Sequence, residues 1–332
     1  MKNLITLLTL IAFLPSCDKK TTISNKIDNQ TQKIDNQAII VNQNNKPKSI
    51  NTQYGPDYYF VVAFYKSVFY GNSLENLSEI NIESAQLDLS PDGKKIAYST
   101  YQNGRQNIKL IEIDTKKEDL LSLPEFGTIM GAWNRDGKHI VISCTNQETN
   151  FYSQPVIYDL DNNKMIYVSW LKSNTDYYNP TFSPNGKKLV FHDIERIYIC
   201  DFNDGKVDLD KTISCEELCK FDNLGFSDLC KFQLTSDSKY LVFSAEIDVT
   251  LDNMCPNLML FSLNLNNGNI KQLTQSNITI ADFVVAAGNE IYFCTCDKIN
   301  NIYGGYFSRL DNSNPICVTT FSEQPFAISI AE

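Results

Sequence analysis

The chain has 332 residues and a net charge of −10, with 29 Lys and Arg against 39 Asp and Glu. It lacks the basic excess that binding to nucleic-acid phosphates requires, so nucleic acid is not an expected partner. It contains two histidines, which argues against a centre built from several histidine ligands. The length allows two ordinary domains or one closed all-β domain.

Residues 1–16 have the features of an export signal. Lys2 gives a basic start, residues 4–14 form an apolar run too short to span a bilayer, and Ser16 precedes Cys17. This ending resembles the lipobox of bacterial lipoproteins, which implies cleavage before Cys17 and attachment of lipid to its thiol. The expected location is the cell envelope, anchored to a membrane and facing the periplasm or the exterior. An ordinary secretory signal is the alternative.

Residues 17–56 are predicted to be a lipidated cysteine followed by a disordered tether. Twelve of the 39 residues in 18–56 are Asn or Gln, and aromatic residues are nearly absent. Such a segment has too little apolar surface to offset the entropy lost on ordering. Residues 57–332 are then the folded part, and because the tether is net basic, this part is more acidic than the whole chain.

Strands are predicted from the start of the folded part. Residues 58–64 and 67–70 are apolar and aromatic, and a turn-and-strand phrase then recurs four times, starting at Leu89, Trp133, Phe182 and Leu234. Its turn positions Asp92, Asp136, Asn185 and Asp237 are 44, 49 and 52 residues apart. Asp-Gly and Asn-Gly between apolar runs are strong hairpin signals, because these residues accept a positive φ. The acidic residues are therefore interpreted as turn residues and not as metal ligands.

Each repeat holds four predicted strands in about 45 to 50 residues, which is typical of a blade of a β-propeller. A fifth, degenerate unit covers residues 280–319, and residues 325–330 form a last strand with nothing after it. Joining that strand to residues 58–70 makes a sixth blade from both termini. The expected fold is all-β: a six-bladed β-propeller of four-stranded antiparallel blades, closed by the N- and C-terminal strands, with seven blades as the alternative.

The phrase resembles the repeat of TolB-type propellers, which is shared with the propeller domains of prolyl oligopeptidases and dipeptidyl peptidases. Residues 90–94 (Ser-Pro-Asp-Gly-Lys), residues 183–187 (Ser-Pro-Asn-Gly-Lys) and the Trp133 position carry the resemblance, which covers about residues 57–331. TolB has an additional N-terminal domain where this chain has a tether. The resemblance implies a TolB-like lipoprotein and says little about function, because such folds host many functions.

A catalytic set is not predicted. The segment Gly225-Phe226-Ser227 is the nearest match to a nucleophile elbow, but Leu229 stands where its second glycine belongs. Propeller lyases that act on pectic sugars resemble this repeat and bind metal through several histidines, whereas this chain has His139 and His192. Both are expected at the surface. No catalytic residue, metal ligand or cofactor is therefore assigned, and calcium is kept only as a structural alternative.

Three of the ten cysteines fall in an insertion predicted to be partly helical. Cys215, Cys219 and Cys230 could form a disulfide outside the cytosol, through Cys215 or Cys219 with Cys230. A zinc site is the alternative, although Cys-x3-Cys without a histidine or a second pair is a weak pattern. Cys144, Cys200, Cys294 and Cys296 lie on predicted strands and are expected to behave as buried apolar residues.

The inner strands carry polar side chains that are predicted to line a central channel, namely Asp88, Asn179, Gln233 and Asp282. The leading hypothesis is a monomeric, non-enzymatic scaffold that binds another envelope protein or a peptide. The alternative is a carbohydrate-binding, hydrolase-type or lyase-type propeller that uses the channel. Carboxylates converging on a pocket would favour the alternative, and a broad apolar face would favour the scaffold.

Overall fold

The structure is a computed structural model that describes residues 58–64, 67–74, 77–82, 84, 86–102, 105–121, 123, 127–145, 152–220, 224–247, 258–274, 279–286, 290–297, 302–310, 315–321 and 324–331. The signal, Cys17 and the tether lie outside these residues. The described part is a ring of six antiparallel sheets, which confirms the predicted six-bladed propeller and excludes seven blades. Within it, no helix has the length and hydropathy needed to cross a bilayer.

The first three blades run from the innermost to the outermost strand as follows. Blade 1 consists of β25 (Pro325–Ala331), β1 (Tyr59–Phe64), β2 (Val68–Gly71) and β3 (Leu77–Ile80). Blade 2 consists of β4 (Leu87–Leu89), β5 (Lys95–Gln102), β6 (Arg105–Glu112) and β7 (Glu118–Leu120). Blade 3 consists of β8 (Thr128–Trp133), β9 (His139–Thr145), β10 (Ser153–Asp159) and β11 (Lys164–Tyr167).

The other three blades follow the same order. Blade 4 consists of β12 (Tyr178–Phe182), β13 (Lys188–His192), β14 (Arg196–Asn203) and β15 (Lys206–Ser214), and the helix α1 (Cys215–Cys219) follows it. Blade 5 consists of β17 (Phe232–Leu234), β18 (Tyr240–Ile247), β19 (Leu258–Asn264) and β20 (Ile270–Gln272), with β16 (Leu224–Gly225) also paired to β18. Blade 6 consists of β21 (Thr279–Val285), β22 (Glu290–Asp297), β23 (Ile302–Arg309) and β24 (Ile316–Phe321).

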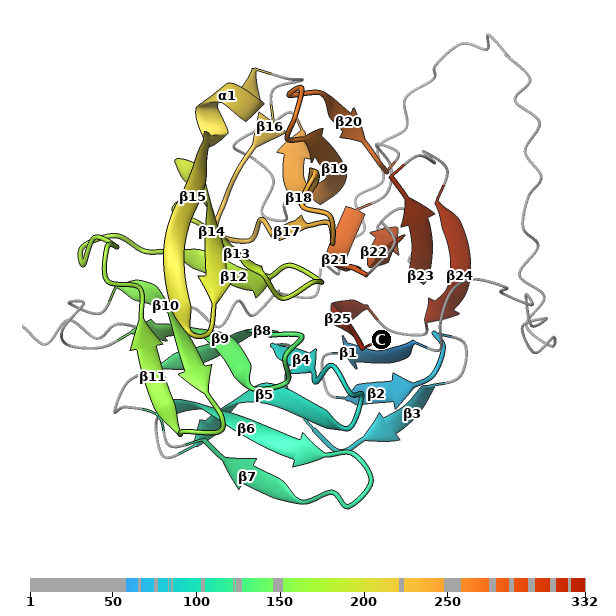
Figure 1. Ribbon diagram of the computed structural model, residues 1–332. Coiled ribbons are helices and arrows are strands. Elements are labelled where there is room, and N and C mark those ends of the chain that lie inside the picture. The colour runs from blue at the N-terminus through green and yellow to red at the C-terminus, as the bar shows by residue number, and fades with distance from the viewer. Residues whose placement is uncertain are drawn as a thin grey trace, which may run out of the picture. The chain divides into compact units, whose positions relative to one another are not determined.

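Both ends of the folded part meet in blade 1. The C-terminal strand β25 pairs antiparallel with β1, and Val61 lies opposite Ser329. Figure 1 shows the inner strands β4, β8, β12, β17, β21 and β25 around the centre of the ring and the outer strands at its rim. The ring is closed because this one sheet is made from both ends of the chain, as the sequence predicted.

The repeated phrase forms the hairpin between the first two strands of a blade. In blade 2, the Ser90 hydroxyl donates to Asp92 Oδ1 at 2.6 Å, the Lys94 N–H donates to the same oxygen at 3.1 Å, and Gly93 has φ +68°. Blades 4 and 5 repeat these bonds with Ser183–Asn185 and Thr235–Asp237. The Asp and Asn of the phrase therefore hold turns, as expected.

The apolar core lies between neighbouring blades. The largest cluster joins blades 4, 5 and 6, where the rings of Phe232, Phe243 and Phe261 stack in series with centroids 5.9 and 5.5 Å apart. Phe232 and Phe243 are fully buried and Phe261 is 2% exposed. Because each blade packs both faces against its neighbours, the ring needs all its blades to cover its apolar surface.

One glycine allows a close approach between blades 3 and 4. A Cβ on Gly131 in β8 would lie 2.6 Å from the Pro180 carbonyl oxygen and 2.8 Å from the Val141 carbonyl oxygen. These are backbone atoms in adjacent strands, so neither can rotate away. The sequence around Gly131 thus fixes how closely the inner strands β8 and β12 pack.

We expect Gly131→Ala to lower the free energy of unfolding by about 2 kcal/mol, because the new methyl group must displace backbone. Urea unfolding followed by circular dichroism measures this change. Gly127→Ala is the matched control, since its Cβ would meet side-chain atoms and not backbone, namely Thr145 Oγ1 at 3.2 Å and Gln106 Oε1 at 3.3 Å. An equal effect of the two substitutions would contradict the assignment of a close contact at Gly131.

Candidate functional site

A cavity of about 1340 Å³ lies at the centre of the ring. Residues from all six inner strands line it, and so do residues that precede those strands, such as Gln86 and Leu229, and residues that follow them, such as Asp92 and Pro184. The cavity therefore extends along the whole length of the inner strands. The four predicted channel residues, Asp88, Asn179, Gln233 and Asp282, are all in its lining.

Asp88 in β4 joins three blades. Its Oδ2 accepts the backbone N–H of Trp133 in blade 3 at 2.5 Å, and its Oδ1 accepts the hydroxyl of Ser329 in the closing strand β25. Burial raises the pKa of Asp88 to about 6, although these two hydrogen bonds and the charge of Lys231 act in the opposite direction. The carboxylate thus forms part of the ring closure as well as part of the cavity wall.

Asp282 in β21 likewise links its own blade 6 to blades 1 and 5. Its Oδ2 accepts the N–H of Ile328 in blade 1 at 2.9 Å, and its Oδ1 lies 2.6 Å from Lys231 Nζ of blade 5. The side chain of Asp282 is 8% exposed and that of Lys231 is 32% exposed. This is a largely buried ion pair between two blades, placed at the cavity wall.

The two amide residues also connect blades. Gln233 accepts the N–H of Val285 in blade 6 at 2.7 Å and donates to the Thr181 hydroxyl in blade 4 at 3.5 Å. Asn179 donates to the carbonyl oxygens of Asp228 and Cys230, at 2.7 and 2.8 Å. The polar groups that the sequence suggested for ligand binding are therefore engaged first in holding the blades together.

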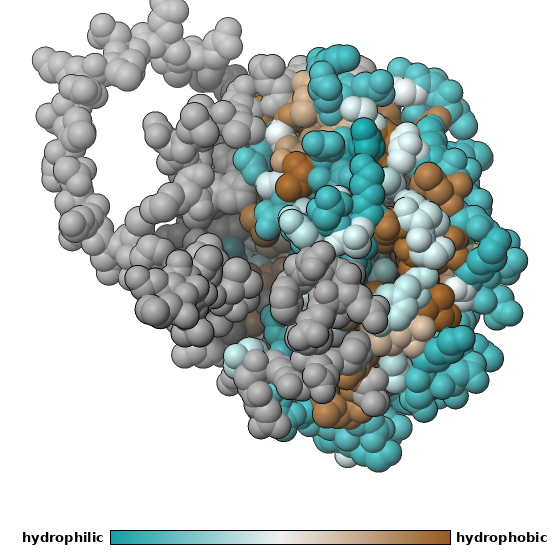
Figure 2. All heavy atoms as spheres, turned by 90° about the vertical axis from the view of Figure 1, so that its left-hand side faces the viewer, coloured by the Kyte–Doolittle hydropathy of each residue, from teal (hydrophilic) through white to brown (hydrophobic). Residues whose placement is uncertain are grey.

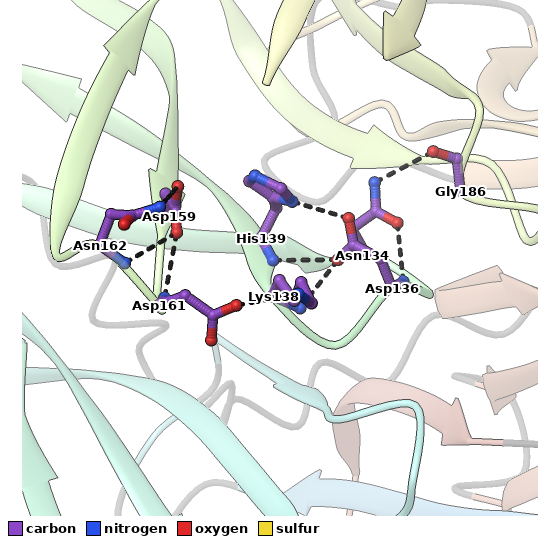
Figure 3. Close-up of polar contacts among 8 residues, drawn as sticks. All are labelled: Asn134, Asp136, Lys138, His139, Asp159, Asp161, Asn162 and Gly186. Atoms are coloured by element: carbon purple, nitrogen blue, oxygen red, sulfur yellow. Dashed lines mark hydrogen bonds and ion pairs between the residues drawn. The ribbon is translucent and has the colours of Figure 1, made fainter. Parts of the chain in front are cut away.

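A second polar network surrounds the blade 3 turn, at the end of the cavity that Asp136 helps to line (Figure 3). The Asn134 amide donates to the Gly186 carbonyl of blade 4 at 3.0 Å, and the Lys138 N–H donates to Asp136 Oδ1 at 2.8 Å. The His139 ring contacts Asp136 Oδ2 through Nδ1 at 2.7 Å. These contacts fix the turn relative to the neighbouring blade.

The expectation that both histidines lie at the surface is wrong. His139 is 6% exposed, because it packs against Phe202. His192 is fully buried against Phe232, and burial lowers its pKa to about 4. His192 ends β13 directly after the buried Phe191, and His139 begins β9 after the turn; in both places aromatic side chains of the core cover the ring.

The cysteines of the insertion have free thiols in the structure. Cys215 begins α1 and is buried together with Cys230, while Cys219 is partly exposed. Burial raises the pKa of the Cys215 and Cys230 thiols to about 12 and about 11, which disfavours their reactive thiolate forms. A disulfide among the three stays a prediction. Cys144, Cys200 and Cys294 are fully buried, as expected.

Metal-binding geometry is not found among the described residues, where no group of three or more His, Cys, Asp or Glu side chains could hold an ion. Ser227, in the segment closest to a nucleophile elbow, donates its N–H to Cys230 Sγ at 3.3 Å. That contact belongs to the loop before β17, where the Ser227 hydroxyl lies 3.9 Å from the same sulfur.

Sequence reasoning missed several residues of this site, of which Lys231, Ser329 and Leu229 matter most. Lys231 and Gln233 alternate with the buried Phe232, so the period of a β-strand could have placed Lys231 on the channel side. Ser329 could be found only after β25 had been paired with blade 1. Leu229, which is 57% exposed at the cavity, gave no sequence signal beyond its loop position.

No protein-family model matches the sequence, and a search of curated proteins finds no relative. Among solved structures, TolB from Acinetobacter baumannii is 16% identical with a TM-score of 0.59, covering 85% of this chain and 69% of TolB. A chain of a nidogen/laminin complex is 12% identical with a TM-score of 0.55, covering 83% of this chain and 98% of that one.

A third similar structure is a candidate 6-phosphogluconolactonase from Bacteroides uniformis, 14% identical with a TM-score of 0.51, covering 83% of this chain and all of that one. These three proteins differ in what they are described to do, and at such identities the likeness concerns the fold alone. The chain is therefore a six-bladed β-propeller whose architecture is similar to that of TolB.

Proposed function

We propose that the chain is a non-enzymatic scaffold that binds another envelope protein or a peptide at its central cavity. The observation that carries this proposal is that the carboxylates of Asp88 and Asp282 in the cavity wall are bonded to neighbouring blades. Both oxygens of Asp88 and one of Asp282 accept hydrogen bonds, and the other oxygen of Asp282 forms the ion pair with Lys231. They support the ring, and the space of about 1340 Å³ beside them is left for a ligand.

The loop before β17 supplies a contact point for a partner. Leu229 is 57% exposed and borders the cavity, and the Asn179 amide holds the carbonyl oxygens on either side of it. An apolar side chain on a loop fixed in this way loses little freedom when it becomes buried in an interface. On the side of the propeller seen in Figure 2, by contrast, hydrophilic residues predominate and hydrophobic ones are interspersed.

The scaffold is proposed to act in the cell envelope, held by lipid on Cys17 and by the tether of residues 18–56. Tryptic peptides of the membrane fraction test the anchor: a lipid-modified N-terminal Cys17 is expected, and Cys17→Ala should release the protein from the membrane. An unmodified N-terminus elsewhere would replace the lipoprotein by a secreted protein and leave the binding function untouched.

A photo-crosslinking residue at position 229 tests the binding function in intact cells. We expect one defined adduct with a protein or peptide there, and none from position 101, where Tyr101 is 74% exposed and does not line the cavity. Equal, diffuse labelling from both positions would contradict a specific partner at the cavity.

The alternative is a carbohydrate-binding, hydrolase or lyase function, favoured by the presence of several carboxylates, among them Asp88 and Asp282 of the inner strands, in a large cavity. It predicts turnover or binding of a polysaccharide or a sugar lactone that is lost in Asp88→Asn and retained in Asp237→Asn, a turn substitution away from the cavity. Such turnover would replace the scaffold proposal.

A further inference from the structure

The outermost strand of blade 6 carries no charged residue. This strand, β24, has the sequence Ile-Cys-Val-Thr-Thr-Phe, in which β-branched residues predominate, as is typical of a stable strand. Among the described residues it pairs with β23 alone, and it is the last strand of its sheet. Figure 1 shows it at the rim of the ring. Its outer edge therefore presents backbone N–H and C=O groups that another strand can bind.

The outermost strands of the other five blades all carry charged residues. Strands β3, β11 and β20 contain one each, namely Glu79, Lys164 and Lys271. Strand β7 begins with Glu118 and Asp119, and β15 contains both lysines and aspartates. Charged side chains protect a sheet edge, because pairing with another strand would place the charge against that strand. Since β24 lacks this protection, it is the outer edge of the ring to which a further strand can add.

The strand is both accessible and held in place. Ile316 is 39% exposed, Thr320 is exposed, and the other four residues are partly exposed. At its end, the ring of Phe321 packs edge-on against Phe64 of blade 1, with centroids 5.2 Å apart. Because the sheet already orders β24, an added strand loses only its own conformational freedom on binding.

Charge favours a second copy of the chain as the partner at this edge. The chain has a net charge of −10, so two copies repel each other and can approach best where the contact is uncharged. Antiparallel pairing of β24 with its own copy fits a two-fold axis, continues the alternation of blade 6 and places no like charges opposite each other. The same pairing at β3, β11 or β20 would bring two equal charges together near the axis.

We propose that two copies of the chain associate edge to edge through β24, so that both copies of blade 6 form one continuous antiparallel sheet. A bulge at Val318 interrupts the regular pairing of β24, since Gly305 pairs with Thr319 and Tyr306 with Cys317. The contact is therefore short, and its dissociation constant is expected on the order of 10 µM. This weak dimer differs from the monomer expected from the sequence. It leaves the central cavity open, because no residue of β24 lines that cavity.

Sedimentation velocity of the full chain, with Cys17→Ala to prevent lipid attachment, tests the inference. We expect monomer at about 1 µM, mostly dimer at about 100 µM and no larger species, because a two-fold contact is closed. Thr320→Lys should weaken the dimer at least about tenfold. Ser78→Lys, at an exposed position of the outer strand β3, is the matched control and should not weaken it. Added salt should strengthen the dimer, since it screens the repulsion between two acidic copies.

A mixing experiment separates edge pairing from a folding defect. Thr320→Lys and Thr320→Glu should each stay monomeric alone, whereas their equimolar mixture should form dimers, because opposite charges then lie near each other across the axis. A misfolded variant would not be rescued in this way. The proposal is overturned if the unmutated protein is monomeric at about 100 µM, if Ser78→Lys weakens the dimer as much as Thr320→Lys, or if the mixture does not associate.

Discussion

Replacing Lys231 with methionine is expected to lower the free energy of unfolding by about 3 kcal/mol. The substitution leaves the Asp282 carboxylate, 8% exposed, without the ammonium that now lies 2.6 Å away. Methionine keeps most of the length of the lysine stem, so the loss comes from the uncompensated charge and not from a cavity. Chemical denaturation at neutral pH measures the effect.

Two variants test that explanation. Lys231→Met combined with Asp282→Asn should recover most of the lost stability, because the buried charge is then removed while an oxygen remains for the Ile328 N–H. Lys206→Met breaks an exposed pair with Asp208, with side chains 74% and 60% exposed, and should change stability by less than about 0.5 kcal/mol. If the double variant is no more stable than Lys231→Met alone, the effect does not arise from the ion pair.

The blades and their turns could be predicted from the sequence because their signals are local. Ser90, Asp92 and Gly93 form a hairpin through bonds within five residues, and the alternation of the flanking strands decides which side chains are buried. The closing of the ring was predicted for a different reason: β1 lacked an inner strand and β25 lacked outer ones, so each could complete the other.

The contacts between blades could not be predicted, because their partners are far apart in the chain. Asp88 and Ser329 are 241 residues apart, and Tyr58 donates to Glu290 over 232 residues. A sequence shows that an inner strand has a polar residue, but not whether a neighbouring blade offers it a donor. This is why Asp88 and Asp282 were predicted as channel residues but not as connections between blades, and why His139 was expected at the surface.

The position of Asp88 between blades makes the free energy of unfolding depend on pH, and the contribution of this one carboxyl can be measured separately. Its pKa is about 6 in the folded protein against an ordinary value of 3.8, so the folded state binds a proton more tightly than the unfolded state. Between pH 6 and pH 4 the folded protein therefore holds more protons, and its stability must rise as the pH falls. Above pH 6 both states are ionised and this contribution is constant.

We therefore expect the stability of the unmutated protein, relative to Asp88→Asn, to increase by about 2 kcal/mol when the pH is lowered from 7 to 4. Asparagine cannot ionise, so the difference between the two proteins isolates this one group, and urea unfolding at several pH values measures it. For Asp92→Asn, the stability of the unmutated protein relative to the variant should instead decrease as the pH is lowered. Although partial burial raises the pKa of Asp92, the bonds from Ser90 and Lys94 and the charges of Lys94 and Lys95 outweigh it, and the pKa is lowered. A stability difference between the unmutated protein and Asp88→Asn that stays constant with pH would contradict this account, because it would mean that the pKa of Asp88 is the same in the folded and the unfolded protein.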